Sequence, residues 1–106
     1  MKEKIRNLLE KVKARLIELY GDKIKLVIVY GSYARGEETE DSDVDILIVI
    51  DDNLNPTKVE ESIDDILFKI LIEEGELCSV MAIPEKLFKN YHSPFLLNAR
   101  EEGVPI

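Results

Sequence analysis

The sequence is short of the residues that build disulfides, histidine-based metal sites and disordered linkers. It contains one cysteine, Cys78, one histidine, His92, no tryptophan, five glycines and four prolines. A single cysteine excludes an internal disulfide, and its place in an apolar run predicts a buried, inert thiol in a reducing compartment. His92 lies in a predicted surface loop, so we expect it neither as a metal ligand nor as a catalytic base. The low glycine and proline content argues against a disordered chain.

Positive charge is also scarce. The chain has 14 Lys and Arg residues against 22 Asp and Glu residues, which gives a formal net charge of −8. A protein that grips nucleic acid needs Lys and Arg side chains against the phosphates, so we do not expect direct nucleic-acid binding. An acidic protein can still bind a polyphosphate if it also holds a divalent metal ion.

Long apolar runs are missing too. No stretch approaches the roughly 20 apolar residues of a membrane span, and the segment after Met1 lacks the continuous apolar core of a signal sequence. We therefore expect a cytoplasmic protein with no membrane association. With 106 residues, of which 45% are hydrophobic and 34% charged, the chain is predicted to form a single domain, residues 1–106, around one core.

Hydrophobic periodicity predicts alternating helices and strands. Helical spacing is found at residues 2–20, 55–74 and 94–102, with shorter helical turns after residue 32 and at 86–91, and apolar runs that predict strands are found at 26–30, 46–50 and 77–83. This order, α-β-α-β-α-β-α, predicts an α+β (mixed α/β) fold: a small three-stranded sheet with helices packed over it.

Capping residues mark the starts of the later helices. Asn55 and Ser93 each precede a proline, which is the pattern of a capped helix with proline at its first position. Thr57 with Glu60 offers an alternative capping box one register on. The run Phe95-Leu96-Leu97 is expected to face the core from the last helix.

Two aspartates open the second predicted strand. In Ser42-Asp43-Val44-Asp45, the two aspartates are two residues apart, and such positions on a strand point to the same face. Carboxylates so close together repel one another, so they either stay solvated and diverge or share a cation. Mg²⁺ is the natural cation, because proteins hold it with one or two carboxylates, water and substrate phosphates. A second ion about 3.5–4 Å away would complete a two-metal site for phosphoryl-type transfer.

A Gly-Ser turn after the first strand supplies the complementary half of a phosphate site. The segment reads Gly31-Ser32-Tyr33-Ala34-Arg35-Gly36. Glycine permits close approach of the backbone, and the serine hydroxyl adds a donor toward an anionic phosphate. Arg35 could either steady a phosphate or pin the acidic loop, and Tyr33 could either stack on a base or pack in the core. No Gly-x-Gly-x-x-Gly or Walker-type motif follows any strand, which excludes the dinucleotide-binding and P-loop classes.

Together, GSYARG and SDVD resemble the signature of the DNA polymerase beta-like nucleotidyltransferase superfamily, most closely its minimal members. The resemblance covers residues 26–50. It implies the nucleotidyltransferase fold, with a small mixed sheet. It also implies that ATP binds against the Gly-Ser turn and that Mg²⁺ binds the aspartate pair, as two ions in the active complex. Pyrophosphate is expected to leave as a nucleotide is transferred. The implied nucleotide-binding residues are Gly31, Ser32, Arg35 and Ser42, and the implied metal-binding and catalytic residues are Asp43, Asp45 and Glu76.

The third of these carboxylates is where the sequence departs from the family pattern. Enzymes of the superfamily usually carry it on the next strand, but residues 77–83 contain no Asp or Glu. Glu76, at the start of that strand, is the candidate. The alternatives are that Glu76 is a solvated charge and that the carboxylate is lost, with Ser79 in its place. Nucleotide binding would then survive while turnover slowed or vanished.

The resemblance also implies an acceptor. Minimal nucleotidyltransferases of this kind are often antitoxins of two-gene modules, whose partner is a HEPN-domain ribonuclease that is modified on tyrosine. The first hypothesis is therefore transfer of AMP from Mg-ATP to a partner hydroxyl. The second is a catalytically weak or inactive module that neutralises its partner by binding. The third, transfer to RNA or to a small molecule, is disfavoured by the acidic charge and by the lack of a further domain.

Overall fold

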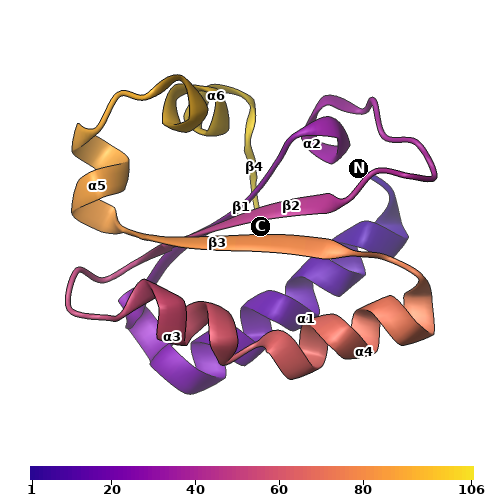
Figure 1. Ribbon diagram of the computed structural model, residues 1–106, viewed down its shortest axis with the longest axis horizontal. Coiled ribbons are helices and arrows are strands. Elements are labelled where there is room, and N and C mark those ends of the chain that lie inside the picture. Colours follow the sequence, from indigo (N-terminus) through magenta and orange to yellow (C-terminus); the bar gives the residue numbers. More distant parts are fainter.

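A computed structural model describes all 106 residues of the chain and shows a four-stranded mixed sheet with helices on both faces (Figure 1). The helices are α1 (Glu3–Tyr20), α2 (Ser32–Arg35), α3 (Pro56–Glu61), α4 (Asp64–Glu74), α5 (Glu85–Asn90) and α6 (Pro94–Glu102). The strands are β1 (Ile24–Tyr30), β2 (Val44–Ile50), β3 (Cys78–Pro84) and β4 (Val104–Pro105), and a 3₁₀ turn, η1, covers Gly21–Lys23. The predicted α+β class is confirmed. None of the helices combines the length and apolar character that crossing a membrane requires.

The sheet contains one strand more than the sequence predicts. Its order is β3-β2-β1-β4, with β2 antiparallel to β1 and parallel to β3, and β4 antiparallel to β1. The extra strand is β4, in which Val104 pairs with Val29 and Pro105 with Ile28. A strand of two residues carries no hydrophobic periodicity, so the sequence pattern could not reveal it.

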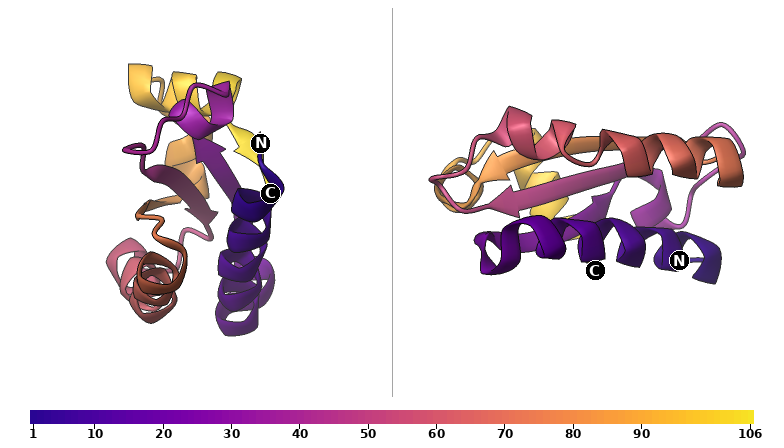
Figure 2. Two further views of the ribbon diagram at one scale, coloured as in Figure 1. Left: turned by 90° about the vertical axis from the view of Figure 1, so that its right-hand side faces the viewer. Right: turned by 90° about the horizontal axis from the view of Figure 1, so that it is seen from below.

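Both faces of the central strand β2 are buried, as its continuous apolar run predicts. One face of the sheet packs on α1, α3 and α4, and the other packs under α5 and α6 (Figure 2). Val44, Ile46, Ile48 and Ile50 enter the larger core, whereas Leu47 and Val49 enter the smaller one. Asp45 shares the face of Leu47 and Val49 because side chains alternate along a strand. The candidate site therefore lies on the α5/α6 side of the sheet.

The predicted helix at 55–74 is broken into α3 and α4. Asn55 caps α3 as predicted, since its Oδ1 accepts a hydrogen bond from the Lys58 amide at 3.2 Å. The break falls at Ser62 and Ile63. The Ser62 hydroxyl donates to the Val59 carbonyl at 2.6 Å, a local bond that competes with helix continuation, and Ile63 leaves helical geometry while its side chain is fully buried. Hydrophobic spacing runs on through such a break, which is why the sequence predicts one helix.

Strand β3 forms one edge of the sheet, and side chains block part of that edge. The Ala82 amide donates to Glu60 Oε2 at 2.9 Å, so a carboxylate of α3 occupies a donor that a neighbouring strand would otherwise use. Pro84, at the end of the strand, has no amide hydrogen. Glu60 therefore binds the sheet edge, and Asn55 caps α3 in place of the alternative capping box.

Arg100 of α6 ties its helix to the end of α5. Its guanidinium donates to the carbonyl oxygens of Phe88 at 2.6 Å, Lys89 at 3.3 Å and Tyr91 at 3.4 Å, and lies 5.7 Å from the centre of the Phe88 ring. Carbonyl groups at a helix end have no partner within the helix, so the arginine satisfies groups that would otherwise need water. The contact holds the two helices of the smaller core together.

Replacing Arg100 by alanine is expected to lower the free energy of unfolding by about 1–3 kcal/mol, because it removes charged hydrogen bonds and a cation–π contact. Urea unfolding measures the change. Arg6→Ala is the matched control, since Arg6 is exposed on α1 and its side chain has no hydrogen bond or ion pair. Equal losses in the two variants would show that the Arg100 contacts add nothing to stability.

Candidate active site

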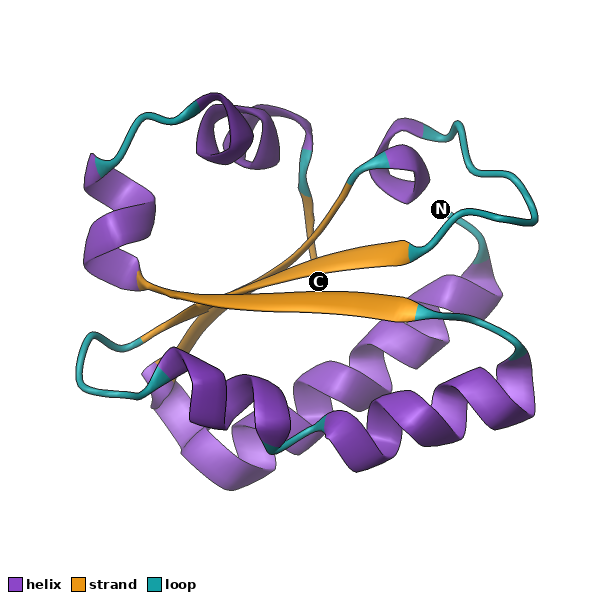
Figure 3. Cartoon of the chain, viewed as in Figure 1, coloured by secondary structure: helices purple, strands orange, loops and turns teal.

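The turn after β1 has the geometry that the Gly-Ser sequence predicts. Gly31 adopts φ 76° and ψ −154°, a conformation that is essentially restricted to glycine. The Arg35 amide donates to the Gly31 carbonyl at 3.2 Å, and the Glu37 amide donates to the Ser32 carbonyl at 2.9 Å. The short helix α2 begins at Ser32, and Figure 3 shows it between β1 and the long loop that leads to β2.

The Gly31 turn lies directly against Asp45. Tyr30, the residue before Gly31, pairs with Asp45 in the antiparallel register of β1 and β2. A Cβ atom at Gly31 would overlap Asp45 Oδ2 and would lie 3.3 Å from Asp45 Cγ. Glycine is therefore needed at this position for two reasons: its backbone conformation and the space that the Asp45 carboxylate occupies. The structure brings the turn and the aspartate together, as the sequence predicts.

The charge of Asp43 acts on Asp45. Partial burial raises the pKa of the Asp45 carboxyl, the nearby Asp43 carboxylate raises that pKa further, and Arg35 opposes the rise. Burial and the charge of Asp45 also raise the pKa of Tyr30. Asp43 is exposed and lies just before β2, which begins at Val44. Two carboxylates with only one nearby cationic side chain are a donor set that suits a hard divalent cation.

Burial of the Asp45 carboxylate, together with the charge of Asp43, predicts that Asp45→Asn stabilises the metal-free protein. A raised pKa means that the folded state binds this proton more tightly than the unfolded state, so stability falls as pH rises past about 3.9, the ordinary carboxyl pKa. At neutral pH the carboxylate is ionised in both states, so the whole of this loss of unfolding free energy is present. In EDTA at pH 7 we expect the variant to gain about 0.5 kcal/mol of unfolding free energy, and below about pH 4 the gain should shrink.

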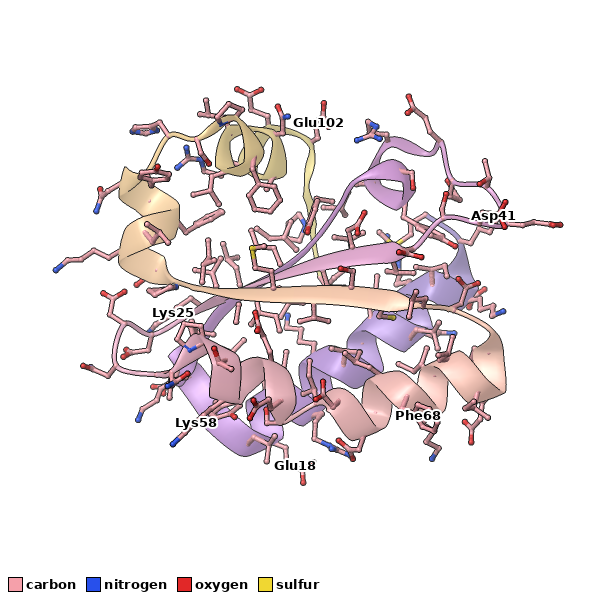
Figure 4. All side chains as sticks on the ribbon, viewed as in Figure 1. Glu18, Lys25, Asp41, Lys58, Phe68 and Glu102 are labelled. Carbon is pink, nitrogen blue, oxygen red and sulfur yellow. The ribbon has the colours of Figure 1, made fainter.

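Urea unfolding at pH 7 and pH 3.5 measures this difference, with Asp41→Asn as the control. Asp41 lies in the exposed loop before β2 (Figure 4), and removing its charge changes the net charge by the same amount. A gain for Asp45→Asn that is the same at both pH values would contradict the electrostatic origin.

The acidic loop before β2 is held by two of the predicted nucleotide-binding residues. The Ser42 hydroxyl accepts a hydrogen bond from the Thr39 amide at 2.9 Å. Arg35 Nε donates to Glu37 Oε2 at 3.0 Å, and its Nη1 lies 3.5 Å from Glu102 Oε2 on α6. Of the two roles considered for Arg35, the structure shows contact with the acidic loop. Roles of Ser42 and Arg35 in nucleotide binding stay predictions.

Glu76 does not join the aspartate pair. No three Asp, Glu, His or Cys side chains gather closely enough to surround a metal ion in this structure. Glu76 instead accepts a hydrogen bond from the Tyr33 hydroxyl at 3.0 Å. The residue of β3 that pairs with Asp45 is Ser79, which is exposed. The geometry thus gives no support to Glu76 as a third ligand, and the pairing matches the alternative in which Ser79 occupies the place of a lost carboxylate.

A small hollow beside Gly31 was not expected from the sequence. It has a volume of about 150 Å³ and lies between the end of β1 and α6. Phe95 is part of its wall, is 37% exposed, and packs edge to face against Tyr30 with ring centres 5.3 Å apart. The prediction that Phe95-Leu96-Leu97 all face the core is therefore wrong, because only Leu96 is buried. Three adjacent helical positions cannot share one face, and this signal was available in the sequence.

Comparison with known proteins gives matches over nearly the whole chain. The nucleotidyltransferase domain family matches residues 9–102. The Methanocaldococcus jannaschii protein named "Putative protein adenylyltransferase MJ0604" is 39% identical over 85 residues, which are 79% of each chain. A second protein from that organism, "Putative protein adenylyltransferase MJ1379", is 34% identical over 100 residues, 94% of this chain and 91% of the other.

Two solved structures share the fold. One, described as a toxin-antitoxin with AMP-PNP, has a TM-score of 0.59 at 17% identity and covers 91% of this chain and 70% of the other. The second is a mutant of the toxin-antitoxin MntA-HpeT, with a TM-score of 0.56 at 14% identity and the same coverage. The family match spans the turn, the aspartate pair and the packed sheet that brings them together. This chain belongs to the nucleotidyltransferase domain family.

Proposed function

We propose that this nucleotidyltransferase transfers AMP from Mg-ATP to a hydroxyl group, expected to be a tyrosine, of a partner protein. The contact between the Gly31 turn and Asp45, with Asp43 beside it, carries the proposal. The two relatives are named putative protein adenylyltransferases, and these names support a protein acceptor. The descriptions of the similar structures, which are toxin-antitoxin complexes, support a role as the antitoxin of such a pair. A HEPN-domain toxin as the partner is what the family resemblance implies.

The residues of the site fit a magnesium-bound triphosphate. Asp43 and Asp45 supply oxygen ligands, and their mutual repulsion favours a bound divalent cation. Bound Mg²⁺ would neutralise phosphate charge and polarise the phosphoryl oxygens. The missing Cβ of Gly31 leaves room for the Asp45 carboxylate against the turn. The Ser32 hydroxyl is available as a donor to a phosphate because no side chain bonds to it.

The proposed transfer exchanges one phosphorus–oxygen bond for another. The acceptor hydroxyl oxygen forms a bond to the α-phosphorus, the bond from that phosphorus to the β-phosphate oxygen breaks, and pyrophosphate leaves. The hydroxyl proton passes to the surrounding water. The chain contributes position and charge: the aspartates would hold the metal ion, and the turn would limit where the triphosphate lies.

A binding module without turnover is the second candidate. The absence of a third carboxylate beside Asp43 and Asp45 favours it, because a positioned base typically contributes about 10²- to 10⁴-fold to such a rate. Transfer to RNA is disfavoured by the net charge of −8.

Mass spectrometry of the partner tests the proposal. The chain is incubated with Mg-ATP and the product of the neighbouring gene, and the partner is expected to gain the mass of one AMP. Fragmentation then shows whether a tyrosine carries it. A partner that co-purifies with the chain but keeps its mass, with ATP and Mg²⁺ both present, would favour the binding module.

A further inference from the structure

The position of the Gly31 turn depends on one buried side chain. Helix α2 contains only four residues, Ser32–Arg35, and of these only Tyr33 is buried, at 7% exposure. A helix of one turn is not stable by itself, because it forms too few hydrogen bonds to offset the lost backbone entropy. Whatever holds Tyr33 therefore helps to hold Ser32 and Gly31 as well.

Tyr33 is held at its far end by Glu76. The phenol hydroxyl donates to Glu76 Oε2 at 3.0 Å, and Glu76 Oε1 lies 3.9 Å from Lys4 Nζ in the first turn of α1. The glutamate side chain is 19% exposed, and a hydrogen bond to a carboxylate is stronger than one between neutral groups. Burial, and then this bond, raise the pKa of Tyr33 to about 12, so the phenol stays protonated as the donor.

The same glutamate lies next to the backbone that positions the aspartates. Leu77 follows Glu76, and its carbonyl accepts a hydrogen bond from the Val44 amide at 2.9 Å. Val44 lies between the two aspartates in the sequence. These contacts form a closed loop. Tyr33, two residues after Gly31, binds Glu76, and the following residue, Leu77, binds the Val44 amide of β2. The next residue of β2, Asp45, lies against Gly31.

We propose that Tyr33 and Glu76 are a positioning pair, whose hydrogen bond fixes the nucleotide-binding turn relative to the aspartates. This inference rests on the proposed function, because it assigns the pair an effect on ATP binding. Glu76 then acts on the turn indirectly, through its hydrogen bond with Tyr33, and contacts neither metal nor nucleotide. Loosening the pair lets Gly31 and Ser32 move away from Asp45, so ATP binds less tightly while the chemical groups stay intact.

Kinetics of three variants separate this role from that of a metal ligand. Tyr33→Phe and Glu76→Ala each remove the bond and are expected to raise the KM for ATP about tenfold with kcat within about twofold. Glu76→Gln keeps an oxygen acceptor and is expected to stay within about threefold of the parent KM. Tyr33→Phe combined with Glu76→Ala should raise the KM for ATP no further than Glu76→Ala alone, because both changes remove the same bond.

A loss of kcat of about 100-fold or more in Glu76→Gln, with Tyr33→Phe unaffected, would overturn the proposal and indicate a metal ligand.

Amide hydrogen exchange tests the pair without any turnover. The Arg35 amide bonds to the Gly31 carbonyl and so reports on the turn. Its exchange rate is expected to rise about tenfold in Tyr33→Phe and Glu76→Ala, and to stay unchanged in the control Tyr91→Phe, whose tyrosine is 57% exposed and has no hydroxyl partner. This readout holds even if the chain transfers no AMP. An unchanged rate in Tyr33→Phe would overturn the proposal.

Discussion

Replacing Asp43 and Asp45 together by asparagine is expected to abolish AMP transfer, with a loss of rate of about 10³-fold or more. Asparagine has nearly the same shape but no charge, so the site loses the anionic oxygens that hold a magnesium-bound triphosphate. The partner should then keep its mass after incubation with Mg-ATP. Calorimetry should also find no metal-dependent heat from the nucleotide.

Glu40→Gln with Asp41→Asn is the matched control for the aspartate pair. Both residues are exposed in the same acidic loop, and the double change removes the same amount of charge. Transfer in this control should remain within about twofold of the parent, because exposed charges interact weakly with the site. A parent-like rate in the Asp43 and Asp45 variant would remove the pair from the mechanism. Equal losses in both variants would attribute the effect to net charge.

Gly31→Ala is expected to have the second-largest effect, on both activity and stability. The added Cβ would overlap Asp45 Oδ2, so the carboxylate must rotate away from its place in the site. The backbone conformation is also strained for any residue with a Cβ, at a cost of about 1–3 kcal/mol. We therefore expect a folded but less stable protein whose transfer rate falls about 100-fold or more.

Gly36→Ala separates backbone strain from displacement of the carboxylate. Gly36 ends the same short helix at φ 71°, and a Cβ there meets no atom within 4 Å. Its replacement should cost about 1 kcal/mol of stability and leave transfer within about threefold. Denaturant unfolding and the partner mass assay measure the two quantities. If both glycine variants lose activity equally, flexibility of the turn matters more than its contact with Asp45.

The aspartate and glycine halves of the site could be predicted because each follows from a local pattern. The apolar run before Gly31 and the apolar run after Asp45 each predict a strand, and two neighbouring strands bring those residues to one end of the sheet. Only 15 positions separate Tyr30 from its strand partner Asp45, so little of the remaining chain is needed to bring the halves together.

Contacts between distant segments could not be predicted in the same way. Tyr33 and Glu76 are 43 positions apart, and nothing in either local pattern shows that the phenol donates to the carboxylate. The family pattern makes Glu76 the candidate third metal ligand because it lies at the start of a strand. The direction of its side chain, however, depends on how α4 ends and how β3 enters the sheet. The hollow against α6 is likewise set by packing between segments, not by periodicity.

The blocked edge at β3 affects how copies of this chain meet in solution. With the Ala82 amide held by Glu60 and no amide hydrogen at Pro84, an approaching strand finds an interrupted row of donors. Edge-to-edge pairing of sheets from separate molecules at β3 is therefore disfavoured. Concentrated samples should resist fibril growth from the β3 edge. A protein that binds this chain at the β3 edge must recognise its side chains, because backbone pairing along β3 is obstructed.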